Sequence, residues 1–560
     1  MGIAATKKYL NLFLLFLILS NCSDTNIDES ENQPPSSFEV TVNSVSETLA
    51  SITWEESLDP EQSTVFYDVF LNSNKLSDNI TELSYTFENL LEDTSYSGEI
   101  IASDPEGNTV SSLFTFTTTE NQPPSPFNIT VTNTDPFYSR IEWTESVDPE
   151  GTTITYNVYL DEELLVEGTT SLNNVFPVLK GLTSYSGKVE AVDNTGKTTT
   201  QVFSFTTQIK IYDDDLLLDN QPSVETFGEG GYNQIDGSLR IGSLNINLTD
   251  VIDLSPLASL SAVNGDLSIR NTICTNFIGL ENINITDEYA KLTIENNDEL
   301  LNLNGLNSIS QIHEVYIADN DALLNLNGLS SLNSVTNYLL VVFNPNLNSI
   351  SGIQNLNSVS NTLEINNNDS LLTLVGLENI TSVGQLSIID NDILESLNGL
   401  SNLNSCTSSL NIADNDSLQN LSHLTGLTYS ASLRITDNPL LTNLTGLENL
   451  TNVNHTLEIA RNSGLTELNG IQNIVFSDNQ ANYHALIIWE NINITNLNPL
   501  SNYTFNRGLI RVDFNTQLTD LCGLTTLITE IDDFINDYNF ASNNGYNPSE
   551  VDILNGNCSI

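Results

Sequence analysis

Residues 386–403 read L-S-I-I-D-N-D-I-L-E-S-L-N-G-L-S-N-L, and residues 410–427 read L-N-I-A-D-N-D-S-L-Q-N-L-S-H-L-T-G-L. The shared pattern L-x-I-x-x-N-x-x-L-x-x-L recurs about every 24 residues, as in 410 − 386 = 24. Its first position falls on twelve residues: Leu239, Leu267, Leu292, Val315, Leu339, Leu363, Leu386, Leu410, Leu433, Leu457, Leu486 and Ile510. Such a period predicts a solenoid whose turns stack on one another.

The alternation L-x-I predicts a short strand with two side chains pointing inward. One unit cannot bury its leucines alone, whereas stacked units can, so we expect the strands to form one parallel sheet. Ten units carry an asparagine at the sixth position, and we expect its buried amide to bond the backbone of its own turn and of the next. These residues are Asn297, Asn320, Asn344, Asn368, Asn391, Asn415, Asn438, Asn462, Asn491 and Asn515. The first two units carry Leu244 and Thr272 there, as expected of end turns.

On these residues, residues 237–530 resemble leucine-rich repeat proteins, most closely the short-turn receptor L-domain kind. The resemblance implies a right-handed solenoid of about twelve turns. It says little about function, because such solenoids support many binding tasks.

A second repeat precedes the solenoid, with an offset of 143 − 54 = 89 residues. Asn32-Gln33-Pro34-Pro35 recurs as Asn121-Gln122-Pro123-Pro124, Trp54 recurs as Trp143, and Tyr96 recurs as Tyr185. Alternating segments separated by turn residues predict a small β-sandwich in each module, 34–120 and 121–208. The early tryptophan, the Y-x-V-x-L strand at 67–71 and the L-x-x-x-T-x-Y corner at 90–96 resemble fibronectin type III domains. The resemblance implies spacer or adhesive modules, and the predicted fold class is mainly β.

The N-terminus carries Lys7-Lys8, an apolar run over 10–19 and Cys22, a pattern typical of a secretory signal that is too short to span a membrane. It resembles a bacterial lipoprotein signal with Leu19 to Cys22 in the lipobox position, although Asn21 departs from the usual small residue. The resemblance implies a signal peptide over 1–21, lipid on Cys22 and an acidic tether over 22–33, as in Bacteroidetes-type surface lipoproteins. The expected location is the outer membrane, facing the exterior. Ordinary secretion with an incidental cysteine is the alternative.

Two further segments lack both repeats. Residues 209–236 are expected to be a linker and an N-terminal cap, with Asn220-Gln221-Pro222 as residual linker. Residues 531–560 are expected to cap the other end with a short helix that begins after Ser549. Cys522 and Cys558 both lie near that end, so export predicts a disulfide between them. Cys406 occupies an inward position and Cys274 lies several turns away, so both are expected to be free.

The composition excludes some classes of function. With 72 acidic and 15 basic residues, a net charge of −57 excludes non-specific binding of nucleic acid. The sequence contains no G-x-S-x-G, H-E-x-x-H or Walker motif, and its four histidines fall on separate units, so no enzyme activity is expected. The Asp59-Pro60-Glu61 turn and its repeat at Asp148-Pro149-Glu150 are also found in calcium loops, but tight turns explain them equally well. No cofactor or metal is therefore expected, with Ca²⁺ as the alternative.

Side chains that flank each inward isoleucine are predicted to point away from the solenoid. They include four of the seven arginines, and aromatic and arginine side chains are typical of interface centres. The predicted ligand face comprises Trp489, Ile487, Arg511, Asp513, Arg434, Tyr316, Val342 and Ile389. We expect contact to centre on Trp489 and Arg511, with the indole available to stack on a sugar ring. The alternative is that aromatic and β-branched residues simply suit exposed strand positions.

Together these features predict a non-enzymatic, lipid-anchored surface protein that binds a protein or glycan partner through the solenoid sheet. The sandwich modules are expected to serve as a stalk. The alternatives are an accessory or unrecognised enzyme of polysaccharide breakdown and a purely structural envelope component.

Overall fold

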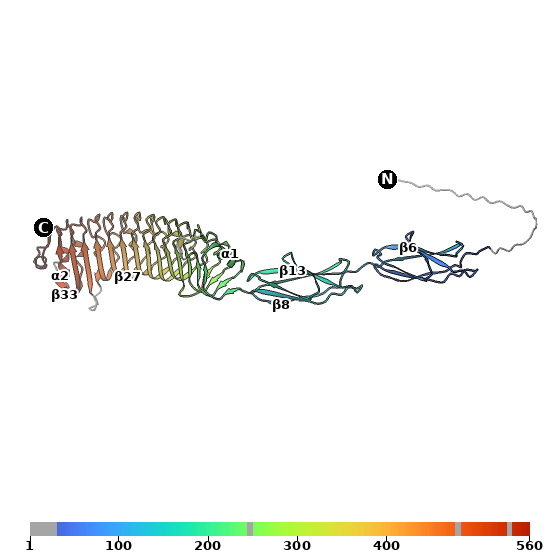
Figure 1. The fold of residues 1–560 in the computed structure, drawn as a ribbon. Helices are drawn as coiled ribbons and strands as arrows, with labels where there is room; N and C mark the ends of the chain where they lie inside the picture. Colours follow the sequence, from blue (N-terminus) through green and yellow to red (C-terminus); the bar gives the residue numbers. More distant parts are fainter. Residues whose placement is uncertain (1–30, 244–249, 477–482, 532, 535–539) are drawn as a thin grey trace, which may run out of the picture. The chain divides into compact units, whose positions relative to one another are not determined.

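The computed structural model describes residues 31–243, 250–476, 483–531, 533–534 and 540–560. Cys22, the predicted signal segment 1–21, most of the predicted tether 22–33 and Leu244 lie outside the described residues. The described chain is mainly β, which confirms the predicted fold class: two sandwiches precede a solenoid in the sequence (Figure 1).

The first sandwich has two antiparallel sheets, of strand order β1-β2-β5 and β4-β3-β6-β7. The strands are β1 (Val40–Val45), β2 (Ala50–Trp54), β3 (Phe66–Leu71), β4 (Asn74–Ile80), β5 (Ser84–Phe87), β6 (Ser95–Ser103) and β7 (Thr109–Thr117). Trp54 and Tyr67 are buried in the core, with ring centroids 5.5 Å apart. The Leu91 N–H donates to the Tyr96 hydroxyl at 2.8 Å and closes the predicted corner.

The second sandwich repeats this plan, with sheets of order β8-β9-β12 and β11-β10-β13-β14. Its strands are β8 (Ile129–Thr134), β9 (Tyr138–Trp143), β10 (Thr155–Leu160), β11 (Glu163–Thr169), β12 (Asn173–Pro177), β13 (Ser184–Val192) and β14 (Thr198–Thr206). Its corner is closed in the same way, because the Lys180 N–H donates to the Tyr185 hydroxyl at 2.9 Å. The 89-residue repeat is therefore a repeat of structure as well as of sequence.

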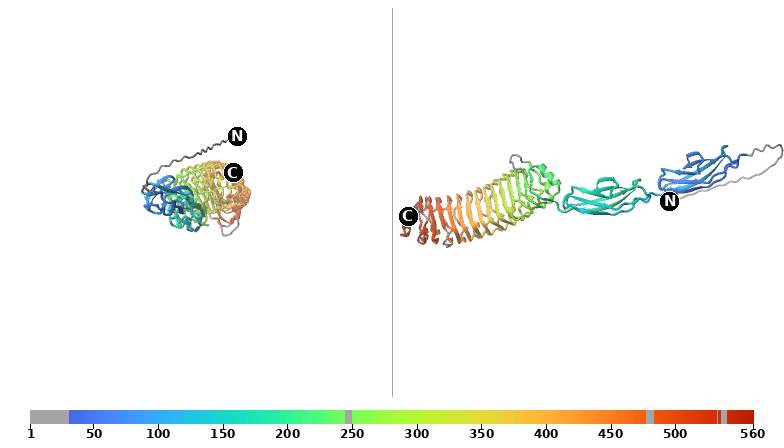
Figure 2. Two further views of the ribbon diagram at one scale, coloured as in Figure 1. Left: turned by 90° about the vertical axis from the view of Figure 1, so that its right-hand side faces the viewer. Right: turned by 60° about the horizontal axis from the view of Figure 1, so that its bottom comes forward.

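The solenoid carries one long parallel sheet along one side (Figures 1 and 2). Its main strands are β16 (Leu216–Leu218), β18 (Leu239–Ile241), β20 (Leu267–Arg270), β22 (Lys291–Glu295), β23 (Gln311–Ala318), β24 (Ser334–Val342), β25 (Ser358–Asn366), β26 (Ser382–Ile389), β27 (Ser405–Ala413), β28 (Tyr429–Thr436), β29 (Asn452–Ala460), β31 (His484–Trp489) and β32 (Arg507–Asp513). The first positions of all twelve predicted units pair with one another in register, for example Leu386 with Leu410. The repeat leucines and isoleucines form one continuous buried core.

Shorter elements complete the solenoid. Further strands are β15 (Ile211–Tyr212), β17 (Gln234–Ile235), β19 (Ala262–Val263), β21 (Asn284–Ile285), β30 (Val475–Phe476), β33 (Asp533–Phe534) and β34 (Ala541–Ser542). Within the described residues, the helices are α1 (Gln221–Glu229), α2 (Thr525–Glu530), α3 (Glu550–Leu554) and the 3₁₀ turns η1 (Ser255–Leu257), η2 (Ser351–Ile353), η3 (Ser422–Leu424), η4 (Asn498–Leu500) and η5 (Cys522–Leu524).

The recurring asparagines form a buried hydrogen-bonded ladder, for which Asn391 is representative. Its Nδ2 donates to the carbonyl of Ile389 at 2.8 Å and to that of Ile365, one turn earlier, at 3.1 Å. Its Oδ1 accepts from the N–H of Asn368 at 3.2 Å, while its own N–H donates to Oδ1 of Asn415 at 3.3 Å. The side-chain amide of Asn391 therefore bonds the backbone of its own turn, as expected, but of the preceding turn instead of the next one. Its backbone N–H makes the link to the next turn, so each ladder residue connects three turns.

The ladder extends beyond the predicted asparagines at its C-terminal end. The Asn515 N–H donates to Oδ1 of Asn544 at 2.9 Å, and Nδ2 of Asn544 donates to the carbonyl of Val512 at 2.7 Å. At the other end the ladder begins with the N–H of Thr272, which donates to Asn297. The segment after the last predicted unit therefore continues the hydrogen-bonding of the solenoid.

Both end regions contain capped helices. Ser549 caps α3 as predicted, accepting from the Asp552 N–H at 3.2 Å. Asn220 was predicted to be residual linker, and this was wrong: its side chain accepts from the Ser223 N–H at 2.9 Å and caps α1. Asparagine is a favoured N-cap residue and proline is tolerated in the first turn of a helix, and this local signal was missed.

Candidate binding face of the solenoid

Parallel register arranges the outward side chains of the C-terminal strands in rows. One row runs from Arg434 through Glu458 and Ile487 to Arg511. Trp489 pairs with Asp513 in the next row. The structure thus places Ile487 and Trp489 beside Arg511 and Asp513, which is the juxtaposition expected from the alternation of the strands.

Trp489 is half-buried between two guanidinium groups. The guanidinium carbons of Arg511 and Arg461 each lie 4.9 Å from the ring centroid. Since β29 and β32 flank β31 on opposite sides, the two arginines approach the indole from opposite sides. A sugar ring would have to displace one of them in order to stack on the indole. The indole Nε1 is buried and has no hydrogen-bond partner among the described residues.

The first guanidinium of this pair, Arg511, is fixed by Asp513. Its Nε lies 3.0 Å from Oδ2 of Asp513. The other oxygen of Asp513 accepts from the backbone N–H of Ser542 at 3.0 Å and from its hydroxyl at 2.6 Å. Asp513 is 9% exposed and ties the last full strand to β34, so its role here is to position Arg511.

The second guanidinium, Arg461, was not among the residues predicted from the sequence. It precedes the ladder residue Asn462 and adopts a left-handed backbone, with φ of 53°. Its Nε and Nη2 donate to both oxygens of Asp437, at 2.6 and 2.5 Å, and this hydrogen bonding raises the pKa of Arg461. A residue with a left-handed backbone lies directly before each ladder asparagine. The L-x-I pattern does not predict this conformation or the direction of the side chain at that position.

The remaining predicted face residues lie elsewhere along the sheet. Arg434 is exposed and forms an ion pair of 3.4 Å with Glu458. Tyr316, Val342 and Ile389 lie on β23, β24 and β26, several strands from Trp489, and the structure does not bring them into its cluster. Val342 is only 6% exposed, so it offers little surface to a ligand.

The acidic turns of the sandwiches use their carboxylates to close loops. Asp59 accepts from the Ser63 N–H at 2.6 Å, Asp104 from the Asn108 N–H at 2.8 Å and Asp193 from the Lys197 N–H at 2.9 Å. Burial raises the pKa of Asp193, but hydrogen bonds from Asn121 and Thr195 outweigh it and lower the pKa overall. In the part of the chain that the structure describes, no group of three or more histidine, cysteine, aspartate or glutamate side chains is arranged to hold a metal.

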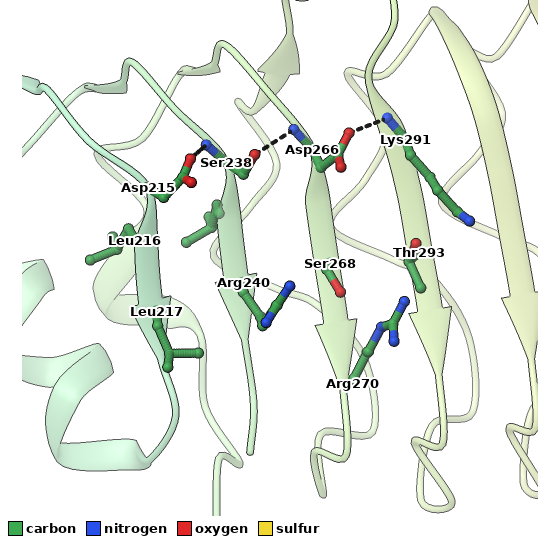
Figure 3. Close-up of a pocket in the computed structure, with 11 residues that line it drawn as sticks. Asp215, Leu216, Leu217, Ser238, Arg240, Asp266, Ser268, Arg270, Lys291 and Thr293 are labelled. Carbon is green, nitrogen blue, oxygen red and sulfur yellow. Dashed lines mark hydrogen bonds between the residues drawn. The ribbon is translucent and has the colours of Figure 1, made fainter. Parts of the chain in front are cut away.

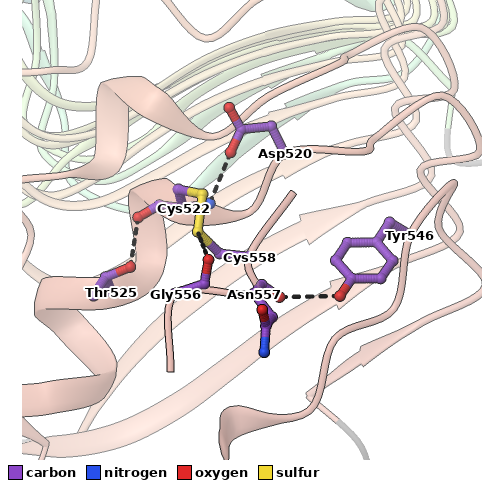
Figure 4. The surroundings of a disulfide bond; sticks show 7 residues. All are labelled: Asp520, Cys522, Thr525, Tyr546, Gly556, Asn557 and Cys558. Carbon is purple, nitrogen blue, oxygen red and sulfur yellow. Dashed lines mark hydrogen bonds between the residues drawn. A yellow bond between two sulfur atoms is a disulfide. The ribbon is translucent and has the colours of Figure 1, made fainter. Parts of the chain in front are cut away.

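The four cysteines within the described residues take the states predicted from their positions. Cys522 and Cys558 form a disulfide, with Cα atoms 4.8 Å apart, which joins η5 to the C-terminal segment (Figure 4). Cys274 and Cys406 are buried and free. Burial raises the pKa of Cys274 to about 11 and that of Cys406 to about 12, so neither thiol is a ready nucleophile at neutral pH.

Among the described residues, no helix is both long and apolar enough to cross a membrane. No family model and no curated protein matches the chain. Fibronectin(III)-like modules of CbhA from Clostridium thermocellum align at 12% identity and a TM-score of 0.16, covering 30% of this chain and 94% of that one. The FN1–FN3 domains of chicken CNTN1 align at 18% identity and a TM-score of 0.17, covering 32% and 70%. The strand order and register described above define a chain with two fibronectin III-like sandwiches and a β-solenoid of about twelve turns.

Proposed function

We propose that this chain is a non-enzymatic recognition protein of the bacterial cell surface. It binds a protein or glycan partner through the outer face of the solenoid sheet, and the sandwich modules act as spacers. Lipid on Cys22 anchors it in the outer membrane, facing the exterior. The receptor L-domain resemblance of the repeats is part of this proposal.

The observation that carries the proposal is the cluster formed by Trp489, Arg461 and Arg511. Cations are rare in this chain, with 15 basic against 72 acidic residues, yet two arginines meet at one tryptophan. Both guanidinium groups are held by carboxylates, so a partner that contacts the guanidinium groups where they lie would meet little ordering cost. Tryptophan and arginine are also the residues that most often dominate binding energy at interfaces.

The test starts from a partner, found by screening the full chain against a glycan array and against proteins of the same cell surface. Trp489→Ala should then weaken binding by about thirtyfold, since truncating such an aromatic residue typically costs about 2 kcal/mol. Tyr289→Ala is the matched control, because Tyr289 is an aromatic residue of the solenoid that is 70% exposed. It lies just before β22, many strands along the sheet from Trp489 on β31. Equal affinity of Trp489→Ala, Arg511→Ala and wild type would refute the assignment.

The anchor has its own test. Cys22→Ser should move the protein from the membrane fraction to the soluble fraction, because a thioether-linked lipid can no longer form. Cys274→Ser is the matched control, since Cys274 is buried in the solenoid and its loss leaves the N-terminus intact. Retention of Cys22→Ser in the membrane fraction would contradict the lipid anchor.

A further inference from the structure

At the opposite end of the same sheet, β16, β18, β20 and β22 border a cavity of about 310 Å³ (Figure 3). Three cationic side chains line it: Arg240, Arg270 and Lys291. They make up a fifth of the 15 basic residues of the whole chain, gathered on three adjacent strands. Like charges gathered in this way repel one another, so their arrangement needs an explanation beyond the solvation of an acidic surface.

The register explains how the cavity is built. Arg240, Ser268 and Thr293 face one another on adjacent strands and form its floor. Arg270 lies two residues beyond Ser268, and Lys291 lies two residues before Thr293, so these two cations flank the row that contains Arg240, on the same face of the sheet. Figure 3 shows the guanidinium groups of Arg240 and Arg270 reaching across the spaces between strands.

The cationic groups are only partly neutralised. Nη1 of Arg270 pairs with Glu295 at 2.9 Å, but its Nε is buried without a hydrogen-bond partner among the described residues. Arg240 is exposed and forms no ion pair with any described residue, whereas Arg270, Arg434 and Arg511 each have one. The Ser268 hydroxyl on the floor is likewise buried and unpartnered within the described chain. The cavity therefore contains hydrogen-bond donors without an acceptor among the described residues, and an acceptor group of a ligand can bind them.

Two carboxylates border the same cavity. Asp215 accepts from the Ser238 N–H at 2.7 Å, and Asp266 accepts from the Lys291 N–H at 2.8 Å. Each bond uses Oδ1, which leaves Oδ2 of each carboxylate without a partner among the described residues. A polyanionic peptide would be repelled by these groups, whereas the hydroxyls of a sugar ring can donate to them.

We propose that this cavity binds an acidic saccharide, in which a carboxylate or sulfate group contacts Arg240 and Arg270 and ring hydroxyls contact Asp215 and Asp266. Arginine suits this task because its planar fork matches the oxygens of a carboxylate or sulfate. The volume is at the lower end of the range for small-molecule sites and suits one or two sugar rings. The proposal goes beyond recognition at Trp489, and it stands whether or not that cluster binds a partner.

The experiment titrates the full chain by calorimetry with short oligomers of galacturonate, of alginate and of sulfated chondroitin. Neutral galactan oligomers, inorganic sulfate and polyglutamate serve as the contrasting probes. At least one acidic oligosaccharide should bind at least tenfold more tightly than all three contrasting probes. Equal binding of the neutral oligomers, of sulfate alone or of polyglutamate would overturn the assigned ligand class, as would the failure of every acidic oligosaccharide to bind.

Variants then locate the site. Arg240→Gln should weaken the acidic oligosaccharide by about tenfold or more, the loss expected when a hydrogen bond to a charged group is removed. Arg140→Gln is the matched control, since Arg140 is a similarly exposed, ion-paired arginine that lies on β9 of the second sandwich, and it should leave the affinity unchanged. Both variants should have the same melting temperature as the wild type. An equal loss in Arg140→Gln, or no loss in Arg240→Gln, would overturn the site.

Discussion

Replacing one ladder asparagine tests how strongly the ladder holds the solenoid together. In Asn391→Ala, the buried N–H of Asn368 loses its acceptor and the carbonyl of Ile365 loses the Asn391 donor. Each buried backbone group left unpaired costs about 1 to 3 kcal/mol, so the variant should lose about 2 to 6 kcal/mol of unfolding free energy. Asn398→Ala is the matched control, because Asn398 lies exposed on the same turn, and it should lie within about 0.5 kcal/mol of wild type.

The assay is urea denaturation followed by tryptophan fluorescence in a Trp54→Phe, Trp143→Phe background. Trp489 is then the single tryptophan and reports unfolding of the solenoid alone. Hydrogen exchange with mass spectrometry should show that the loss of protection centres on the turns on either side of Asn391. If Asn391→Ala were as stable as Asn398→Ala, the ladder would contribute no net stability, and the leucine core alone would hold the turns together.

A second substitution at the same position separates hydrogen bonding from packing. Asn391→Asp keeps the size of the side chain and its Oδ1 acceptor, but puts an oxygen where Nδ2 faces the carbonyls of Ile365 and Ile389. A buried carboxylate beside two carbonyl oxygens is strongly disfavoured, so its folded pKa should be raised and the variant should gain stability as the pH falls. A stability difference from wild type that is the same at neutral and at acidic pH would contradict this explanation.

Three further predictions follow from other parts of the solenoid. Cys558→Ser should cost about 3 to 4 kcal/mol, from a loop with a sequence separation of 36, and a reductant should destabilise wild type but not the variant. Gly399→Ala should lower the free energy of unfolding by at least about 2 kcal/mol, because φ is +117° and the added Cβ would lie 2.0 Å from the Leu374 carbonyl oxygen. Gly556→Ala is the control and should cost only about 1 kcal/mol, because the space around Gly556 is open. Equal decreases in the melting temperature of the two variants would contradict the clash. Burial, and then the charges of Asp437 and Asp390, raise the pKa of Asp414, so the solenoid should gain stability as the pH falls from neutral through that raised pKa and lose it as the pH rises again. Asp414→Asn should weaken this dependence of the free energy of unfolding on pH, and an unchanged dependence would contradict the explanation.

The repeat fold was predictable because one physical requirement recurs at one spacing. Every unit must bury its leucines against the next, so the L-x-I positions had to align, and all twelve did. The disulfide was predictable for a similar reason, since both cysteines belong to one end of a linear stack. Asn544 was missed because no L-x-I strand pattern precedes it, although its amide performs the same bonding as that of Asn515.

The binding face was less predictable, because it depends on side-chain directions that no period encodes. The alternation placed Trp489 beside Arg511 but gave no sign that Arg461 would approach the indole from the other side. Arg461 belongs to a left-handed turn rather than to the strand alternation, and its guanidinium is directed by Asp437 one turn away. A charged residue in such a turn can be assigned to the strand face only once its partner is known.

The net charge of −57 gives the acidic-saccharide proposal an unusual dependence on salt. At low ionic strength the acidic surface repels an anionic oligosaccharide over a Debye length of about 30 Å at 0.01 M, before it reaches Arg240 and Arg270. At about 0.1 M salt the Debye length is about 10 Å, so the distant acids are screened while direct contacts to the two arginines are largely retained. Affinity for an acidic oligosaccharide should therefore rise between these concentrations and fall again toward 1 M, where screening reaches contact distances. The affinity of a site on a basic surface instead falls steadily as the salt concentration rises. A steady fall of affinity in the same calorimetric titration would therefore show that the cations of the cavity, and not the acidic surface of the rest of the protein, determine the electrostatic potential at the site.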